Sequence, residues 1–273
     1  MKLIDIGANI SHDSFDDDRD AVLERAYEAG VTRLILTGSS KDSNRKVLQL
    51  AKDRPGQLWC TAGVHPHHAT DYNDDLHLSI RTKLEEPEVV AVGECGLDYF
   101  RNFSPAEVQR VVFERQLELA EECGLPVFLH QRDAQKDFID ILRPRLPNLS
   151  RAVTHCFTGS EKELRELLDL DLYIGITGWI CDERRGTHLK DIVRLIPDDR
   201  LMIETDAPYL LPRSLRPTPK TRRNEPAWLT EVLRVVAEAR GRSPEEVAAT
   251  TSKAAEVFFD LPPAPDRAPA RRL

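Results

Sequence analysis

The sequence contains little cysteine, no paired cysteine motif and no long apolar run. Its five cysteines are odd in number and form no CxxC or CxxH pair, so neither a disulfide framework nor a zinc ribbon is expected. No stretch of about 18 apolar residues occurs. The N-terminal MKLIDIGANIS has the pattern of a strand and lacks the apolar core of a signal peptide. We therefore expect a cytoplasmic protein without membrane association.

Basic residues are also in the minority, because 38 Lys and Arg stand against 46 Asp and Glu, for a net charge of −8. This balance does not favour a protein that coats nucleic acid non-specifically. It is compatible with an enzyme that has a local basic rim around a metal site. The chain of 273 residues, 41% of them hydrophobic, is long enough to bury a sizeable core.

Short apolar runs alternate with longer amphipathic stretches, which predicts parallel βαβ units. Eight such runs favour a closed (β/α)8 TIM-type barrel, an α/β fold, over an open sheet. A doubly wound sheet is the alternative, and the absence of GxGxxG after the first strand disfavours it. The expected strands are 2–6, 33–37, 58–63, 89–93, 126–130, 151–155, 172–176 and 201–205, and the expected helices include 18–30, 43–53, 105–124, 135–142, 161–168 and 188–196.

Residues 224–259 have the pattern of two further helices, which we expect to cover the outer wall of the barrel. Ser243, Pro244 and Glu246 suit the N-cap, first and third positions of the second helix. The segment that follows is rich in Pro, Ala and Arg. We predict a single barrel domain over residues 1–260 and a disordered tail over 261–273.

Four ionisable residues stand where an apolar strand ends, namely Glu94, His130, His155 and Asp206. Barrel enzymes collect their catalytic groups at the carboxyl ends of the strands. Two imidazoles and two carboxylates are a suitable set of ligands for a divalent cation. Four unrelated polar residues at strand ends are the alternative, but matching chemistry at four ends of one face favours a metal centre.

Other polar residues follow the same strands. His65 and Arg132 are candidates for contacts with substrate, whereas His67 and His68 are expected to be exposed loop residues. Asp98 either contacts a ligand or shapes its loop, and the sequence does not favour one role over the other.

A basic cluster occupies the loops after the seventh and eighth strands, a region that often binds phosphate in barrels. Arg185 and Arg223 are the members we select as substrate contacts, although a solvated charge run is an alternative for each. Trp179, Tyr209 and Phe103 lie in the loops of the same face and are candidates either for stacking on a base or for packing. The cluster consists of Arg184, Arg185, Arg213, Arg216, Lys220, Arg222 and Arg223.

Five ordered motifs resemble the TatD family of metal-dependent deoxyribonucleases, and in particular its bacterial subgroup. They are GECGLDY (93–99), HCFTG (155–159), YIGITGWICDERRG (173–186), ETDAPYLLP (204–212) and RRNEP (222–226). The resemblance extends over nearly the whole chain. It implies a fold similar to the amidohydrolase barrels and a Mg2+-dependent 3′–5′ exonuclease for single-stranded DNA and RNA, with Mn2+ or another divalent cation as the alternative metal.

The resemblance also assigns roles to individual residues. The bridging glutamate of the family matches Glu94, its two later histidines match His130 and His155, and its late aspartate matches Asp206. All four are thereby expected to be metal ligands. Glu94 and Asp206 are in addition the expected catalytic groups, with Asp206 either completing the coordination or orienting the attacking water.

The first strand departs from the pattern of many TatD-like hydrolases. They carry His-x-His at its end, whereas this chain has Gly7-Ala8-Asn9, a pattern that the bacterial subgroup shares. Two nitrogen ligands of one metal site are therefore missing. We expect one firmly bound metal, with a second cation arriving together with the substrate phosphate.

Three functions compete at this stage. The first is a nuclease with metal-activated water as nucleophile. The second is an amidohydrolase-like enzyme that acts on an ester, an amide or an aminoacyl-tRNA. The third is a binding protein with a degenerate site, which only the change at Gly7 and Asn9 supports. We expect a monomer without an obligate protein partner.

Overall fold

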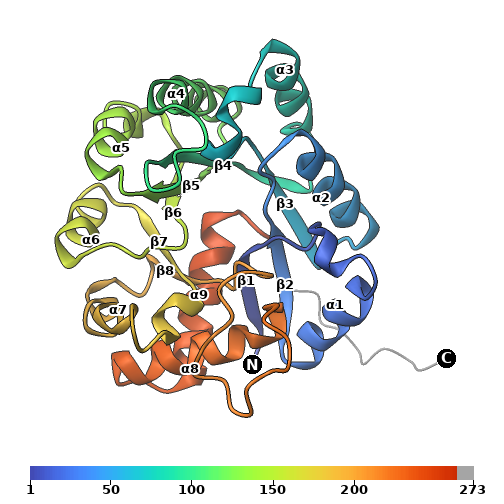
Figure 1. The fold of residues 1–273 in the computed structure, drawn as a ribbon, viewed down its shortest axis with the longest axis vertical. Coiled ribbons are helices and arrows are strands. Elements are labelled where there is room, and N and C mark those ends of the chain that lie inside the picture. Colours follow the sequence, from blue (N-terminus) through green and yellow to red (C-terminus); the bar gives the residue numbers. More distant parts are fainter. Residues whose placement is uncertain (263–273) are drawn as a thin grey trace.

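The computed structural model describes residues 1–262 and contains a barrel of eight parallel strands surrounded by helices (Figure 1). The strands are hydrogen-bonded in chain order, each parallel to the next. This arrangement confirms the predicted (β/α)8 architecture and places all carboxyl ends of the strands at one face. The strands are β1 (Leu3–Ala8), β2 (Val31–Leu36), β3 (Leu58–Ala62), β4 (Val89–Asp98), β5 (Val127–Arg132), β6 (Ala152–Thr154), β7 (Tyr173–Ile176) and β8 (Leu201–Ile203).

A helix connects each pair of consecutive strands, and one of these helices was not predicted. This helix, α3, buries only Leu76 and Ile80, so its apolar stripe is too short to stand out in the sequence. The helices around the barrel are α1 (Arg19–Glu28), α2 (Lys41–Asp53), α3 (Asp74–Lys83), α4 (Ala106–Cys123), α5 (Gln135–Leu142), α6 (Glu161–Leu168), α7 (Thr187–Ile192) and α8 (Leu229–Arg240). Short 3-10 turns occupy Asp13–Phe15, Pro66–Asp71, Leu146–Asn148, Gly178–Cys181, Val193–Leu195 and Pro226–Trp228.

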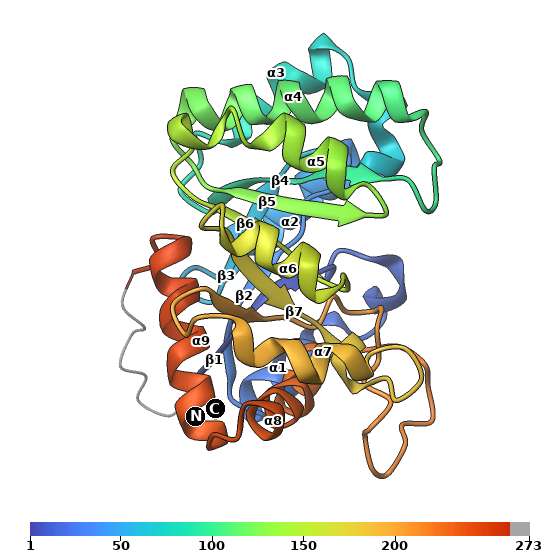
Figure 2. The same cartoon turned by 90° about the vertical axis from the view of Figure 1, so that its left-hand side faces the viewer.

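The final helix, α9 (Pro244–Phe258), closes the amino-terminal end of the barrel. Figure 2 shows it lying across the end at which the strands begin. The expectation that both carboxyl-terminal helices cover the outer wall is therefore wrong for α9, whereas α8 does lie on that wall. Its Ser243 N-cap accepts a hydrogen bond from the Glu246 N–H, as the sequence predicts. The helix packs on the side chains that point into the barrel, and the joint cluster consists of Ile4, Ile6, Ile35, Trp59, Val90, Ala91, Phe128, Val153, Tyr173, Met202, Ala254, Ala255, Phe258, Phe259 and Leu261.

The segment after β8 completes the barrel against β1 without forming a strand. The Asp206 N–H donates to the Gly7 carbonyl at 2.8 Å, and the Asn9 N–H donates to the Ala207 carbonyl at 2.7 Å. These two bonds satisfy backbone groups that would otherwise be buried without partners at the edge of β1. They also fix the position of Asp206 at the carboxyl-terminal face.

A buried carboxylate reinforces the same seam. Asp5 accepts hydrogen bonds from the Thr205 N–H at 2.9 Å, the Thr205 hydroxyl at 2.5 Å and the Gly7 N–H at 3.2 Å. Asp5 is fully buried, and this burial raises its pKa to about 7, although the bonds from Thr205 and Gly7 act in the opposite direction. The side chain therefore joins β1 to the end of β8.

The described chain extends slightly past the predicted end of the domain. Leu261 is buried, and the Pro262 carbonyl accepts a hydrogen bond from the Arg33 guanidinium at 3.2 Å, so both residues belong to the folded part. The remainder of the segment expected to be disordered, 263–273, lies outside the described residues. No helix within residues 1–262 is both long and apolar enough to cross a membrane.

Candidate metal centre

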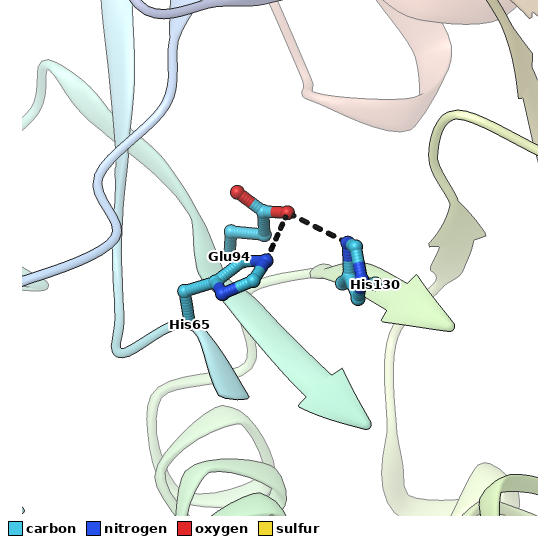
Figure 3. Close-up of side chains that lie close together, drawn as sticks. All are labelled: His65, Glu94 and His130. Carbon is cyan, nitrogen blue, oxygen red and sulfur yellow. Dashed lines mark hydrogen bonds and ion pairs between the residues drawn. The ribbon is translucent and has the colours of Figure 1, made fainter. Parts of the chain in front are cut away.

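Glu94 lies at the centre of a group of three imidazoles. Its Oε1 atom is 3.3 Å from His65 Nε2, 3.1 Å from His130 Nδ1 and 2.8 Å from His155 Nε2. Figure 3 shows the contacts from His65 and His130, which meet at the same carboxylate oxygen. Burial alone would raise the pKa of Glu94, but the surrounding histidines hold it well below its usual range. The carboxylate is therefore ionised.

Two glycines allow β4 to approach β5 closely at this point. Gly93 and Gly96 have φ values of 136° and 138°, which favour glycine, and a Cβ at either position would collide with the backbone of β5. The two strands remain paired as far as Asp98 and Arg132. Glu94 therefore lies inside its strand, whereas the sequence places it immediately after a strand ending at 93.

Asp98 orients His130 from the side opposite Glu94. Its Oδ2 atom is 3.3 Å from His130 Nε2 and 2.8 Å from His67 Nε2, and its Oδ1 accepts the Arg101 N–H at 2.8 Å. Burial raises the pKa of Asp98, but the hydrogen bonds from the two histidines outweigh it and keep this carboxyl far below its usual range. The expectation that His67 is an exposed loop residue is wrong, because Asp98 holds it against the site.

Glu204 plays the corresponding part for His155, and the sequence analysis did not identify it. Its Oε2 atom is 3.3 Å from His155 Nδ1, and its Oε1 accepts the Cys156 N–H at 2.5 Å. The carboxylate is fully buried between β1 and β7. Gly7 in β1 and Gly175 in β7 leave space for it because they have no side chains. A Cβ at Gly175 would lie 2.6 Å from Oε1, and one at Gly7 would collide with Oε2.

These contacts determine which ring nitrogens of two histidines can bind a cation. When His130 donates its Nε2–H to Asp98, and His155 its Nδ1–H to Glu204, the nitrogen that faces Glu94 is left with a lone pair. Burial lowers the pKa of both imidazoles, yet the carboxylates outweigh it and raise both pKa values above the usual range. The site therefore attracts positive charge, which suits a divalent cation.

His65 has the opposite arrangement. Its Nδ1 accepts the His67 backbone N–H at 3.0 Å, so the ring proton lies on Nε2, which points at Glu94. Burial lowers the pKa of His65 to about 4, so the ring is neutral near pH 7. The donor atoms of His65, Glu94 and His130 lie within 4.8 Å of one another. The placement of the proton nevertheless makes His65 a donor to Glu94 and a weaker candidate for metal binding than His130 or His155.

Asp206 follows β8 and belongs to the same face. Its Oδ1 accepts a hydrogen bond from the side-chain amide of Asn9, the residue after β1, at 2.9 Å, and this bond holds Asp206 in position. Burial raises the pKa of Asp206 to about 7, and the charges of Glu94 and Glu204 add to this effect, whereas His155 lowers it. Among residues 1–262, the group with donor atoms within 4.8 Å of one another includes neither Asp206 nor His155.

Two of the arginines selected from the sequence stack on aromatic rings beside the metal centre. The Arg132 guanidinium lies 4.0 Å from the centroid of Phe100, and that of Arg185 lies 4.5 Å from the centroid of Trp179. Arg185 is also 3.4 Å from a carboxylate oxygen of Asp182. Both positions are compatible with a contact to substrate.

Arg223, by contrast, is occupied by contacts within the protein. Its guanidinium pairs with Asp18 at 2.7 Å and with Glu225 at 2.9 Å. Glu225 in turn pairs with Arg25 at 2.8 Å, and the buried Asn224 donates its amide to the Thr205 carbonyl. The RRNEP motif therefore ties the chain after β8 to α1, and both terminal nitrogens of Arg223 donate to groups within the protein.

Other members of the basic cluster are neutralised in the same way. Arg184 pairs with Asp182 at 3.0 Å, and Arg213 pairs with Glu183 at 2.9 Å. The loops after β7 and β8 are thus less positive than their arginine content suggests, because acidic residues of the loop after β7 compensate the charge.

Comparison with known proteins agrees with this geometry over nearly the whole chain. The family model described as TatD related DNase matches residues 4–260. The chain is 50% identical over 260 residues to the 3′-5′ ssDNA/RNA exonuclease TatD of Erwinia billingiae, covering 95% of this chain and 100% of that protein. It is 51% identical over 258 residues to the exonuclease of the same name from Cronobacter sakazakii, covering 94% and 98%. Among solved structures, the TatD homologue YjjV of Escherichia coli superposes with a TM-score of 0.86 at 30% identity, covering 95% and 98%.

Proposed function

Because the chain belongs to the family of TatD-related DNases, we propose that it is a metal-dependent nuclease that removes nucleotides from the 3′ end of single-stranded DNA and RNA. The observation that carries the proposal is the convergence of His130 and His155 on Glu94, each histidine oriented by a second carboxylate. Such pairs of carboxylate and histidine are the usual support of a protein metal site.

In this proposal Glu94, His130 and His155 hold one divalent cation, Mg2+ or Mn2+. Bound there, the cation would lower the pKa of a water molecule and polarise the phosphodiester. His65 donates its Nε2–H to Glu94 and thereby fixes the carboxylate that the cation requires. Its neutral ring adds no charge to compete with the metal.

Asp206 is proposed as the group that accepts the proton of the attacking water. Burial raises its pKa in the metal-free protein, and a bound cation would lower that pKa again, so that the carboxylate would be ionised and able to accept a proton. The Asn9 amide keeps one oxygen of Asp206 in place, which leaves the other oxygen for the water. Coordination of the metal by Asp206 is the alternative.

The test uses single-stranded oligonucleotides labelled at either end, incubated with wild-type protein in Mg2+, in Mn2+ and in EDTA. We expect a ladder of products that retain the 5′ label, formed only with metal. Glu94→Gln and His130→Ala should abolish it, whereas His68→Ala, a variant of an exposed histidine, should not. Wild type that shortens neither DNA nor RNA would contradict the proposal, and hydrolysis of small esters alone would favour the amidohydrolase reading.

A further inference from the structure

A cavity of about 660 Å3 opens at the carboxyl ends of β5, β6 and β7, on the same face as the candidate metal centre. Its wall includes Arg132, two residues after His130, and Thr158, three residues after His155. The cavity therefore adjoins the metal centre along two strands. Its volume falls within the range of about 300–1,000 Å3 that is typical of pockets for small organic ligands.

Two pairs of an aromatic ring and an arginine form part of the wall. Phe100, in the loop after β4, carries the Arg132 guanidinium at 4.0 Å, and Trp179, in the 3-10 turn after β7, carries that of Arg185 at 4.5 Å. Phe100 is 55% exposed, so part of its ring is accessible to a ligand. Exposed aromatic faces of this kind stack on nucleobases, and a stacked arginine adds to the attraction.

The charge of the cavity selects an uncharged occupant. Four acidic residues line the wall, against two arginines, so a phosphate group would meet net negative charge. One of the acids, Glu163, is already engaged with the Ser160 N–H at 2.7 Å in the cap of α6. The acidic residues are Asp133, Glu161, Glu163 and Asp191. A flat neutral ring satisfies these surroundings better than a phosphate does.

Arg132 supplies the polar contact that such a ring needs. Among the described residues its guanidinium has neither an ion pair nor a hydrogen bond. It makes a cation–π contact with the ring of Phe100. A half-buried guanidinium in this situation keeps its N–H donors for a ligand. Carbonyl oxygens and ring nitrogens on the edge of a base are suitable acceptors.

We propose that this cavity is a nucleobase subsite, in which one unpaired base of the substrate stacks on Trp179 or Phe100 and accepts a hydrogen bond from Arg132. The proposal rests on the nuclease function proposed above. It accounts for the requirement for a single strand, because a base paired and stacked in a duplex cannot enter a cavity of this kind. It also predicts little sequence preference, because every base offers a flat face.

Steady-state kinetics with two substrates test the proposal. One is a single-stranded oligothymidylate, and the other is the same oligonucleotide with abasic residues at its last two 3′ positions. For the normal substrate, Trp179→Ala and Phe100→Ala should each raise KM about tenfold with little change in kcat. Trp179→Phe should retain most of the affinity. On the abasic substrate these variants should match wild type, and Leu78→Ala, which removes an exposed side chain from α3, should match wild type on both.

A binding measurement without turnover separates this proposal from the proposed function. In EDTA, oligothymidylate should quench the tryptophan fluorescence of wild type, and Trp179→Phe should lose that quenching. Unchanged KM in the alanine variants, or an equal rise on both substrates, would overturn the base subsite even if wild type proves to be a nuclease. Absence of hydrolysis by wild type would instead overturn the proposed function, while quenching that depends on Trp179 would still support a base-binding cavity.

Discussion

Two buried carboxylates control the chemistry of the site without facing the position of the cation. Asp98 holds Nε2 of His130, and Glu204 holds Nδ1 of His155, so different nitrogens of the two rings face Glu94. A histidine without such a partner can flip its ring or protonate the nitrogen that should bind metal. We therefore regard Asp98 and Glu204 as positioning residues.

The prediction at this scale concerns Glu204. Glu204→Ala should raise the concentration of Mg2+ or Mn2+ needed for half-maximal oligonucleotide hydrolysis about 10- to 100-fold, because His155 loses its fixed orientation. Glu204→Gln, which keeps an acceptor for the His155 N–H, should recover part of this loss. Glu118→Ala removes an exposed carboxylate from α4 and serves as control. A metal titration that is the same for Glu204→Ala and wild type would show that Glu204 does not position His155.

The sequence identifies residues of this site only where a strand carries them to its carboxyl end. Glu94, His130 and His155 fit that rule, and the structure brings all three together. Glu204 directly follows β8, so its own position at the carboxyl end of a strand was the signal that could have revealed it. The contact of His67 with Asp98 joins the 3-10 turn after β3 to the end of β4, and no local pattern encodes it.

At the scale of elements, α9 is important for stability because it closes the amino-terminal end of the barrel. Its Phe258 is fully buried at the amino-terminal end of the barrel, where its ring lies 4.9 Å from that of Tyr173. The neighbouring Val257 is 45% exposed. The helix therefore fills an opening in the bottom of the barrel that the strand residues alone leave.

Phe258→Ala should lower the free energy of unfolding by about 3–5 kcal/mol, because it removes a large buried side chain and leaves a cavity. Val257→Ala should change it by less than about 0.5 kcal/mol, as expected for an exposed position. Urea denaturation followed by circular dichroism measures both values. Equal effects of the two substitutions would mean that α9 does not close the barrel as described.

Helices and strands were predictable to the extent that their own apolar pattern is strong. All eight strands follow from short apolar runs, and α5 and α6 begin and end at the predicted residues. The position of α9 was not predictable, because an amphipathic helix that caps a barrel has the same pattern as one that covers its wall. The continuation of β4 to Asp98 depends on its close approach to β5. Gly93 and Gly96 permit this approach, but their presence in the sequence does not predict it.

At the scale of the whole molecule, closure of the barrel depends on the seam between β1 and the end of β8. Asp5 bonds to Thr205 across it, and its pKa is raised from 3.8 to about 7. The folded protein therefore keeps a proton on Asp5 up to about pH 7, whereas the unfolded chain releases it near pH 4. Between these values the folded state binds more protons, so Asp5 makes the protein less stable as the pH rises from 4 to 7 and has no further effect above that range.

Asp5→Asn should remove this dependence, since an amide can donate to the Thr205 hydroxyl and accept from the Thr205 N–H without titrating. Relative to the variant, wild type should lose up to about 4 kcal/mol of unfolding free energy between pH 4 and pH 8. Chemical denaturation at a series of pH values measures the difference. Parallel pH profiles for the two proteins would show that Asp5 keeps an ordinary pKa in the folded state.

The room that Gly7 leaves for Glu204 also restricts how this barrel can change during evolution. A side chain at position 7 would collide with the Glu204 carboxylate. A side chain at position 7 therefore requires the Glu204 carboxylate to shift, and because this carboxylate bonds to His155, the shift would disturb the orientation of that imidazole. A substitution of Gly7 should thus reach the metal centre through Glu204, so the first strand can change at residue 7 only together with a rearrangement around His155.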